Sequence, residues 1–428
     1  MGAIKLDRRV AYRFVLSDNG LAQMPNGRKH SKLVEDPASV SKELVSRIYE
    51  DILSESCVVF VGAGSTTERP YGNRESFYEK IRDIAKFPPG RPSFPELMQY
   101  YCDRIDGGHH NRLIREAVSR IELFCVRGED NQLATMFTDS LAEIPYFNRF
   151  VTTNWDPFLE RSLDVLVPMV EDRDLAFWDD HKRQVLKIHG CITRPYSIVA
   201  TQSDYDRCMD LNPLVFNKLK DLMATKTFLF SGYSMRDPDF QIVWELIGSK
   251  LGHFGKTAYA LDPKATDDQI SHWKGRGIQI YKITDIMFAR RLRARLEKER
   301  LIPSTEFLHF LQKQAHRITS LHIRMGQTSD SRLASAMYQD GLLHELSSVI
   351  TSNTLGTKKK EDFEKSEGDA VKTLRRIKQD RDPIEIAYWA GRVEILERFN
   401  RRKRSPIPAY FHPYQLRPMT KLLKGKAL

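Results

Sequence analysis

The sequence has few cysteines, and their arrangement does not suggest a metal site or a disulfide framework. Five cysteines are scattered through 428 residues, and no two of them form a Cys-x-x-Cys pair. A zinc ribbon needs two such pairs, and a disulfide-stabilised secreted domain needs a denser set. We therefore expect neither a zinc ribbon nor a disulfide scaffold, and no bound metal.

Long apolar runs are missing as well. No run approaches the roughly twenty residues that span a bilayer, and the first residues, MGAIKLDRRVAYRF, contain no apolar core of the kind found in signal peptides. With 41% hydrophobic and 29% charged residues, the composition is typical of a globular protein. We expect no membrane contact, a cytoplasmic location and, at this length, two or three domains.

Net positive charge is absent from the first two thirds of the chain. Residues 288–428 hold a positive excess larger than the net charge of +11 of the whole sequence, so the preceding residues are close to neutral. The α/β patterning ends at the same place. We therefore expect a polar, turn-rich N-terminal arm over 1–40, a main domain over 41–284 and a basic C-terminal region over 285–428.

The main domain centres on a glycine turn that follows a buried strand. Residues 58–61, VVFV, form a β-branched and aromatic run typical of a strand buried on both faces. The run ends in GAGS at 62–65, where backbone N–H groups without a neighbouring Cβ can close on a phosphate. A plain tight turn is the alternative, because Thr67 occupies the position of the third glycine in the dinucleotide fingerprint.

Further strands and helices alternate along the main domain. We expect strands at 150–153, 185–189, 197–200, 227–231, 257–261 and 278–283, and helices at 40–53, 213–224 and 239–251. Residues 72–147 have helical spacing throughout, which is too long for a simple crossover and indicates an inserted helical subdomain. The pattern predicts an α/β, Rossmann-like fold, a doubly wound parallel sheet with this helical insertion.

Polar clusters follow three of these strands, at the edge of the sheet where ligands of α/β proteins bind. In TTNWD at 152–156, Asn154 and Asp156 can hold hydroxyls or water, or can simply cap the next helix. His189, which precedes a glycine, can be a general base or a structural histidine. SGYS at 231–234 can contact phosphate or ribose, or can be an ordinary loop.

Together and in this order, the clusters resemble the sirtuin-like (SIR2-type) family. The resemblance rests on GAGS at 62–65, TTNWD at 152–156, KIHG at 187–190 and FLFSGYSMRDPDF at 228–240, and it covers about residues 45–283. It extends to the bacterial branch that cleaves NAD+ in anti-phage defence, including the NAD-cleaving domain of Thoeris-type effectors. It implies a Rossmann-like sheet with a helical module, NAD+ as the substrate and a bacterial NAD+ glycohydrolase.

The resemblance also implies roles for individual positions. Asn154 would hold the nicotinamide ribose and the attacking water, and His189 would be the general base. The residues that would contact NAD+ are Gly62, Ala63, Gly64, Ser65, Thr153, Asp156, Gly232 and Ser234. Asp262, directly after the strand expected at 257–261, is a further candidate, for the adenine ribose.

The sequence departs from deacylating sirtuins in two ways. It lacks their two Cys-x-x-Cys pairs, which argues against protein deacylation. After the glycine turn it continues with ERPYG at 68–72, where those enzymes have a Gly-Ile-Pro-Asp-Phe-Arg-like stretch that orders the nicotinamide end. Hydrolysis of NAD+ to nicotinamide and ADP-ribose needs neither feature.

The C-terminal region is expected to be mainly helical, at 285–301, 304–321, 331–350 and 383–399, with a charged loop at 358–369. This architecture resembles the sirtuin-like subunit that works beside a HerA-type ATPase, whereas Thoeris effectors continue into a second α/β domain. The basic residues form a solvated face, a surface for self-association or an ATPase partner, or a nucleic-acid contact. Interleaved apolar residues favour oligomerisation over nucleic-acid binding.

Two functions stay open on the sequence. The first is an NAD+ hydrolase that depletes NAD+ and so kills or arrests the infected cell, in a complex with a HerA-type ATPase. The second is a non-hydrolytic nucleotide-binding or nucleic-acid-binding subunit of a defence assembly. The presence of both Asn154 and His189 favours the enzyme, because a protein that only binds has no chemical need for the pair.

Overall fold

The computed structural model describes residues 36–69, 75–125, 129–235, 238–252, 255–324, 330–380 and 383–409. Most of the arm predicted for 1–40 and the end of the basic tail lie outside these residues. The first helix, α1 (Pro37–Leu53), begins within the predicted arm. Among the described residues, no helix has both the length and the apolar character needed to cross a membrane.

A six-stranded parallel sheet forms the centre of the main domain. Its strands are β1 (Cys57–Val61), β2 (Arg149–Thr152), β3 (Gln184–Lys187), β4 (Thr227–Ser231), β5 (Ala258–Leu261) and β6 (Ile278–Tyr281). They lie in the order β3-β2-β1-β4-β5-β6, and each neighbouring pair is parallel. The direction of winding changes between β1 and β4, which places the switch point of the sheet beside the glycine turn. The predicted Rossmann-like, doubly wound fold is confirmed.

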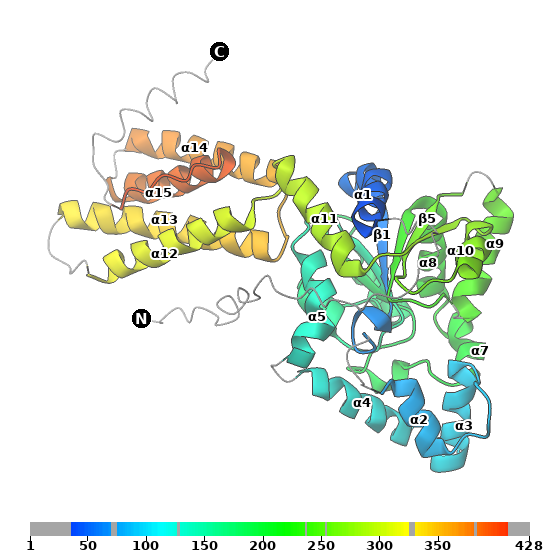
Figure 1. The fold of residues 1–428 in the computed structure, drawn as a ribbon. Helices are drawn as coiled ribbons and strands as arrows, with labels where there is room; N and C mark the ends of the chain where they lie inside the picture. The colour runs from blue at the N-terminus through cyan, green and yellow to red at the C-terminus, as the bar shows by residue number, and fades with distance from the viewer. Residues whose placement is uncertain are drawn as a thin grey trace, which may run out of the picture. The chain divides into compact units, whose positions relative to one another are not determined.

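Helices cover both faces of the sheet, as Figure 1 shows. Alternate residues of β1 point to opposite faces, so that Val59 and Val61 join one core while Val58 and Phe60 join the other. The first core is closed by α1, α5 (Glu129–Ala142), α6 (Phe158–Leu163) and α11 (Asp285–Lys298). The second is closed by α7 (Gln202–Leu211), α8 (Pro213–Thr225), α9 (Pro238–Leu251) and α10 (Asp267–Lys274).

The helical segment between β1 and β2 divides into two parts. Its last helix, α5, packs on the sheet, whereas α2 (Phe77–Ala85), α3 (Phe94–Asp106) and α4 (Asn111–Cys125) share a small core of their own. These three helices lie together in Figure 1. Ser76 caps α2, and a reciprocal capping box between Ser93 and Glu96 begins α3, so local hydrogen bonds define where both helices start.

Two sequence-based expectations are wrong. Residues 197–200 do not form a strand: Pro195–Ser197 is a 3₁₀ turn, and Val199 N–H bonds only to His189 O beside the end of β3. The charged stretch 358–369 is not a loop, because α14 (Lys360–Asp380) begins there. Buried residues at helical spacing, Phe363, Ala370, Leu374 and Ile377, hold α14 in place beneath its charged surface.

The C-terminal region forms a bundle with a separate core. Its helices are α12 (Thr305–Arg324), α13 (Asp330–Thr354), α14 and α15 (Pro383–Asn400), which lie side by side in Figure 1. α13 and α15 approach each other at two glycines. A Cβ on Gly341 would lie 2.0 Å from Tyr388 O, and one on Gly391 would lie 2.3 Å from Tyr338 O, so this crossing admits only glycine.

The tight crossing predicts that two glycine-to-alanine substitutions change the free energy of unfolding in opposite directions. Gly341→Ala is expected to lower the free energy of unfolding by about 1–3 kcal/mol, because the two helices must move apart. Gly368, in α14, has no atom within 4 Å of the position of a Cβ. Gly368→Ala is therefore expected to raise the free energy of unfolding by about 0.5–1 kcal/mol through helix propensity. Urea unfolding of the full chain measures both, and equal stability of the two variants would contradict the tight crossing.

Candidate active site

A cavity of about 680 Å³ lies at the carboxyl ends of the central strands. Its wall is formed by the segments that follow β1, β2, β3 and β4, and by residues of α2, α3 and α4 and the loop before α3. This is the size of a small-molecule site, at the position where doubly wound sheets bind ligands. Of the predicted site residues, those that line the cavity are Ala63, Gly64, Thr153, Asn154, Asp156, His189, Gly232 and Ser234.

Three predicted site residues do not line the cavity. Gly62 donates its N–H to Ser231 O at 2.8 Å, and the Ser65 hydroxyl lies 2.8 Å from that of Ser231. Asp262 accepts a hydrogen bond from Lys264 N–H in the turn after β5. The structure therefore places Gly62 and Ser65 in the contact between β1 and β4, and Asp262 in a local turn.

The glycines at the switch point allow two loops to pack backbone against backbone. Gly64 N–H donates to Gly232 O at 2.9 Å, and a Cβ on Gly62 would lie 2.3 Å from the same oxygen. Gly232 has a φ of +62°, and a Cβ there would lie 2.1 Å from Ser65 N. The loop after β1 is thus fixed against the loop after β4, and the N–H groups of Gly62 and Gly64 are used in this contact.

Asn154 and Asp156 share a partner, Thr66. The Asn154 side chain donates from Nδ2 to Thr66 Oγ1 at 3.0 Å, and Thr66 Oγ1 donates to Asp156 Oδ2 at 3.0 Å. Asp156 Oδ1 accepts from the N–H of Phe158, the first residue of α6, at 3.1 Å, although the N-cap position itself is occupied by Pro157. Asn154 caps no helix, and its Oδ1 is buried with no hydrogen-bond partner among the described residues.

A buried ion pair lies beneath this network. The Lys187 side chain is fully buried, with Nζ 3.2 Å from Glu160 Oε1 and donating to Asp156 O at 2.7 Å. Burial raises the pKa of Asp156, and the positive charge of Lys187 opposes that rise. The sequence reasoning missed Lys187 and Glu160 as a pair. The available signal was a lysine inside an apolar strand, because an unpaired lysine is almost never fully buried.

His189 lies against Tyr205 of α7. Its Nδ1 is 3.3 Å from the Tyr205 hydroxyl, and the two rings meet edge to face with centroids 4.8 Å apart. The adjacent Gly190 has a φ of +84° and leaves no room for a Cβ beside Ser197 O. His189 and Tyr205 both line the cavity, so the imidazole is held in the wall by aromatic contact and a tight turn.

The helical insertion supplies an aromatic wall. Trp155 packs against Phe77 of α2 and Phe94 of α3, with ring centroids 6.0 and 5.9 Å apart. Glu68, after the glycine turn, accepts from Arg120 Nη2 of α4 at 3.0 Å and from Phe77 N–H at 3.1 Å. Burial raises the pKa of Glu68, and Arg120 opposes the rise. Glu68 and Arg120, which the sequence reasoning did not single out, therefore join the loop after β1 to the insertion.

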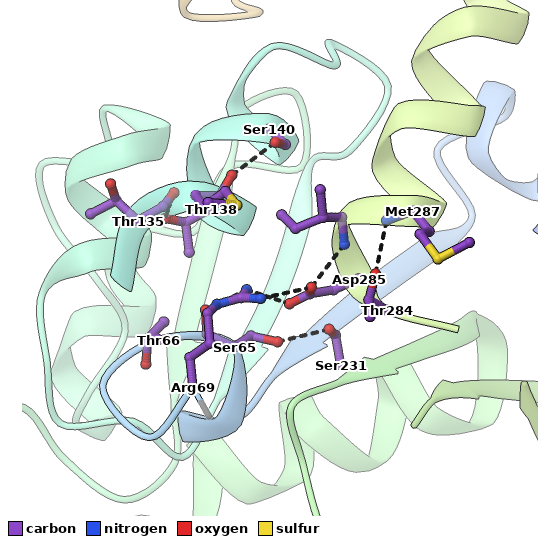
Figure 2. A network of polar contacts seen from close by, with 12 residues as sticks. Ser65, Thr66, Arg69, Thr135, Thr138, Ser140, Ser231, Thr284, Asp285 and Met287 are labelled. Atoms are coloured by element: carbon purple, nitrogen blue, oxygen red, sulfur yellow. Dashed lines mark hydrogen bonds and ion pairs between the residues drawn. The ribbon is translucent and has the colours of Figure 1, made fainter. Parts of the chain in front are cut away.

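On its other side the same loop is joined to α11. Figure 2 shows Arg69 reaching Asp285, the first residue of α11, with Nη1 and Nη2 at 3.0 and 2.6 Å from the two carboxylate oxygens. Arg69 Nη2 also donates to Ser65 O at 3.1 Å. Two parallel N–H donors to one carboxylate fix the guanidinium geometry, and so fix the end of the loop.

No three His, Cys, Asp or Glu side chains are grouped as metal ligands within the part of the chain that the structure describes. The polar groups gathered at the cavity are instead an amide, an imidazole, hydroxyls and paired charges. Such groups can orient a polar ligand and move protons.

In a comparison with known protein families, residues 148–281 match the model described as a SIR2-like domain. NAD(+) hydrolase ThsA of Cytobacillus dafuensis is 24% identical over 249 residues, which cover 56% of this chain and 47% of that protein. The ThsA proteins of Bacillus cereus (strain MSX-D12) and Enterococcus faecium are 25% and 27% identical over 225 residues each, covering 44% and 45% of their lengths. The chain thus spans less than half the length of the relatives it matches.

The buried ion pair gives a prediction about stability. Lys187→Met is expected to lower the free energy of unfolding by about 3–5 kcal/mol, because it leaves the Glu160 carboxylate buried without its partner. The double variant Lys187→Met, Glu160→Leu removes both charges and is expected to recover most of that loss. Urea unfolding measures both variants. A single variant as stable as the parent protein would show that the pair is not held as described.

Proposed function

We propose that this chain, whose residues 148–281 are similar to a SIR2-like domain, is an NAD+ hydrolase that cleaves the bond between nicotinamide and ribose and releases nicotinamide and ADP-ribose. One observation carries the proposal: the buried Asn154 Oδ1 has no partner among the described residues, in the wall of a cavity that also contains His189. A buried amide oxygen without a partner costs free energy unless a ligand supplies the missing donor. A ribose hydroxyl or a water molecule is such a donor.

The reaction depends more on positioning the ribose and the water than on a strong acid or base, because nicotinamide is a good leaving group. As the glycosidic bond breaks, its electron pair moves to the nicotinamide ring nitrogen, which is cationic in NAD+ and becomes neutral. Water then forms the new bond to the ribose carbon and loses a proton. Asn154 Oδ1 accepts a hydrogen bond from the ribose hydroxyl or the water, and His189 takes the proton and returns it to solvent.

The cavity offers different surfaces to the two kinds of group in NAD+. Backbone and hydroxyl groups near Thr153, Gly232 and Ser234 suit the polar sugar and phosphate groups, and the wall of Phe77, Phe94 and Trp155 suits a flat ring. The three relatives named NAD(+) hydrolase ThsA support NAD+ as the substrate. Conversion to a cyclic product is the alternative outcome of the same bond cleavage.

We further propose that the activity serves anti-phage defence in the bacterial cytoplasm, where NAD+ depletion arrests the infected cell. In this proposal the chain forms a homo-oligomer and works with a HerA-type ATPase. The support is architectural: after β6 the described residues form only helices, and α12–α15 have a core independent of the sheet. A bundle of this kind suits assembly, and the basic residues beyond it leave nucleic acid as the alternative partner.

The first test is NAD+ consumption by the purified full chain, alone and with a HerA-type ATPase, with nicotinamide, ADP-ribose and cyclic product resolved by chromatography. His189→Ala and Asn154→Ala are each expected to lower kcat by at least about 10²-fold while the protein stays folded. His181→Ala is the matched control, because this exposed histidine lies outside the cavity lining, and it should keep full activity. NAD+ binding without cleavage under both conditions would instead support a binding subunit.

A further inference from the structure

We infer that Thr66 is a positioning residue that orients the side-chain amide of Asn154, and that the charge of Asp156 decides the direction of the Thr66 hydroxyl. The inference deepens the proposed function, on which it rests, because it says why the amide presents oxygen rather than nitrogen to the substrate. Thr66 is not part of the cavity lining, so it acts through Asn154 and not by touching NAD+.

Thr66 occupies the middle of a short hydrogen-bonded chain. Its Oγ1 is 3.0 Å from Asn154 Nδ2 and 3.0 Å from Asp156 Oδ2. Among the described residues, the other acceptor within hydrogen-bond distance of this hydroxyl is Ala63 O, at 3.5 Å. Thr66 is 1% exposed, so water does not compete for these bonds. One hydroxyl group thus connects the carboxylate to the amide.

The donor and acceptor roles in this row of hydrogen bonds follow from the chemistry of the two groups at its ends, the Asp156 carboxylate and the Asn154 amide. An ionised carboxylate only accepts hydrogen bonds, so the Thr66 O–H must donate to Asp156 Oδ2. The Thr66 oxygen is then left to accept, and it accepts from the Asn154 NH₂ group. Asn154 Oδ1 therefore faces away from Thr66 as an acceptor. This is the polarity that a ribose hydroxyl or a nucleophilic water requires.

Protonation of Asp156 would reverse the donor and acceptor roles in the hydrogen bonds that join Asp156, Thr66 and Asn154. A neutral carboxyl can donate to Thr66 Oγ1, and the Thr66 proton then turns toward Asn154. The amide satisfies that donor best by rotating, which directs its oxygen to Thr66 and its NH₂ group to the cavity. A donor at that position cannot accept from the hydroxyl or the water, so the active polarity requires the Asp156 carboxylate.

The surroundings of Asp156 set the pH at which this reversal occurs. Burial raises its pKa, Glu160 of α6 adds to the rise, and Lys187 of β3 and the Phe158 N–H oppose it. Lys187, the buried lysine of the KIHG motif, therefore acts indirectly on the Asn154 amide, because its positive charge favours the charged form of Asp156 at neutral pH. Because the folded-state pKa of Asp156 is raised, ionising it costs stability as the pH rises through that pKa.

The test separates the hydroxyl from the shape of residue 66. Thr66→Val keeps the shape and removes the donor, and it is expected to lower kcat by about 10–100-fold and to weaken NAD+ binding several-fold. Thr66→Ser restores the hydroxyl and should return both to within a few-fold of the parent protein. Thr138→Val makes the same change at another buried threonine and should alter neither. A fully active Thr66→Val, or a Thr66→Ser as impaired as the valine variant, overturns the inference.

The variant Asp156→Asn provides a second, independent test of the inference. The new amide can still accept from Phe158 N–H but donates to Thr66, as the protonated acid does. The variant should therefore have low activity at every pH, and it should lack the loss of activity at acid pH that is expected for the parent protein when Asp156 becomes protonated. Its melting temperature at pH 7 should equal or exceed that of the parent, because a buried charge is gone. Wild-type activity with an unchanged pH profile in this variant overturns the inference.

Measurements of NAD+ binding distinguish a failure of this inference from a failure of the proposed function. NAD+ affinity is measured by calorimetry for the parent, Thr66→Val and Thr66→Ser proteins, alongside turnover. If the parent binds NAD+ without cleaving it and binding follows the hydroxyl, the hydrolase proposal fails while the role of Thr66 stands. If the parent cleaves NAD+ and neither binding nor turnover follows the hydroxyl, the role of Thr66 fails while the hydrolase stands.

Discussion

The architecture of the cavity depends on the backbone contact between the loops that follow β1 and β4. Gly64 N–H reaches Gly232 O, and the absence of side chains at Gly62 and Gly232 lets the two loops close on each other. With its start fixed in this way, the loop after β1 sends Thr66 to the polar network, Glu68 to α2 and α4, and Arg69 to α11. The glycines thus contribute to the construction of the site by allowing the two loops to pack together.

Buried charge is the second constraint on the site. Lys187 and Glu160 lie behind the cavity wall, next to Asp156 in the wall itself, and all three are nearly inaccessible to solvent. The two carboxyl groups outnumber the single lysine. An apolar substitute for such a cluster is often as stable or more so, so stability alone does not explain it. In the role inferred for Thr66, the cluster orients the hydroxyl and amide groups next to it, and so connects the cavity to Lys187 and Glu160, which do not line it.

Much of this arrangement could be predicted from the sequence. Apolar runs located all six strands, and polar residues directly after them indicated the cavity, because parallel strands end at one edge of a sheet. Pairs joined only through space were missed, as with Lys187 and Glu160 or Glu68 and Arg120, since neither spacing nor composition connects them. The strand expected at 197–200 is wrong because Ile198 and Ala200 pack into the core of α2–α4, and Val199 bonds only to His189 O after β3. The helix α14 was missed because its charged residues outnumber its buried ones.

The cavity wall is formed by two sets of segments that can change independently of each other. The amide and the imidazole for which we propose catalytic roles follow strands of the sheet, whereas much of the aromatic wall belongs to α2–α4, which pack around a different core. Substitutions or insertions in these helices can reshape the entrance and the ring-binding wall while the sheet and the buried charges stay intact. The shape of the ring-binding wall and the position of the polar groups are therefore determined by segments that fold around different cores.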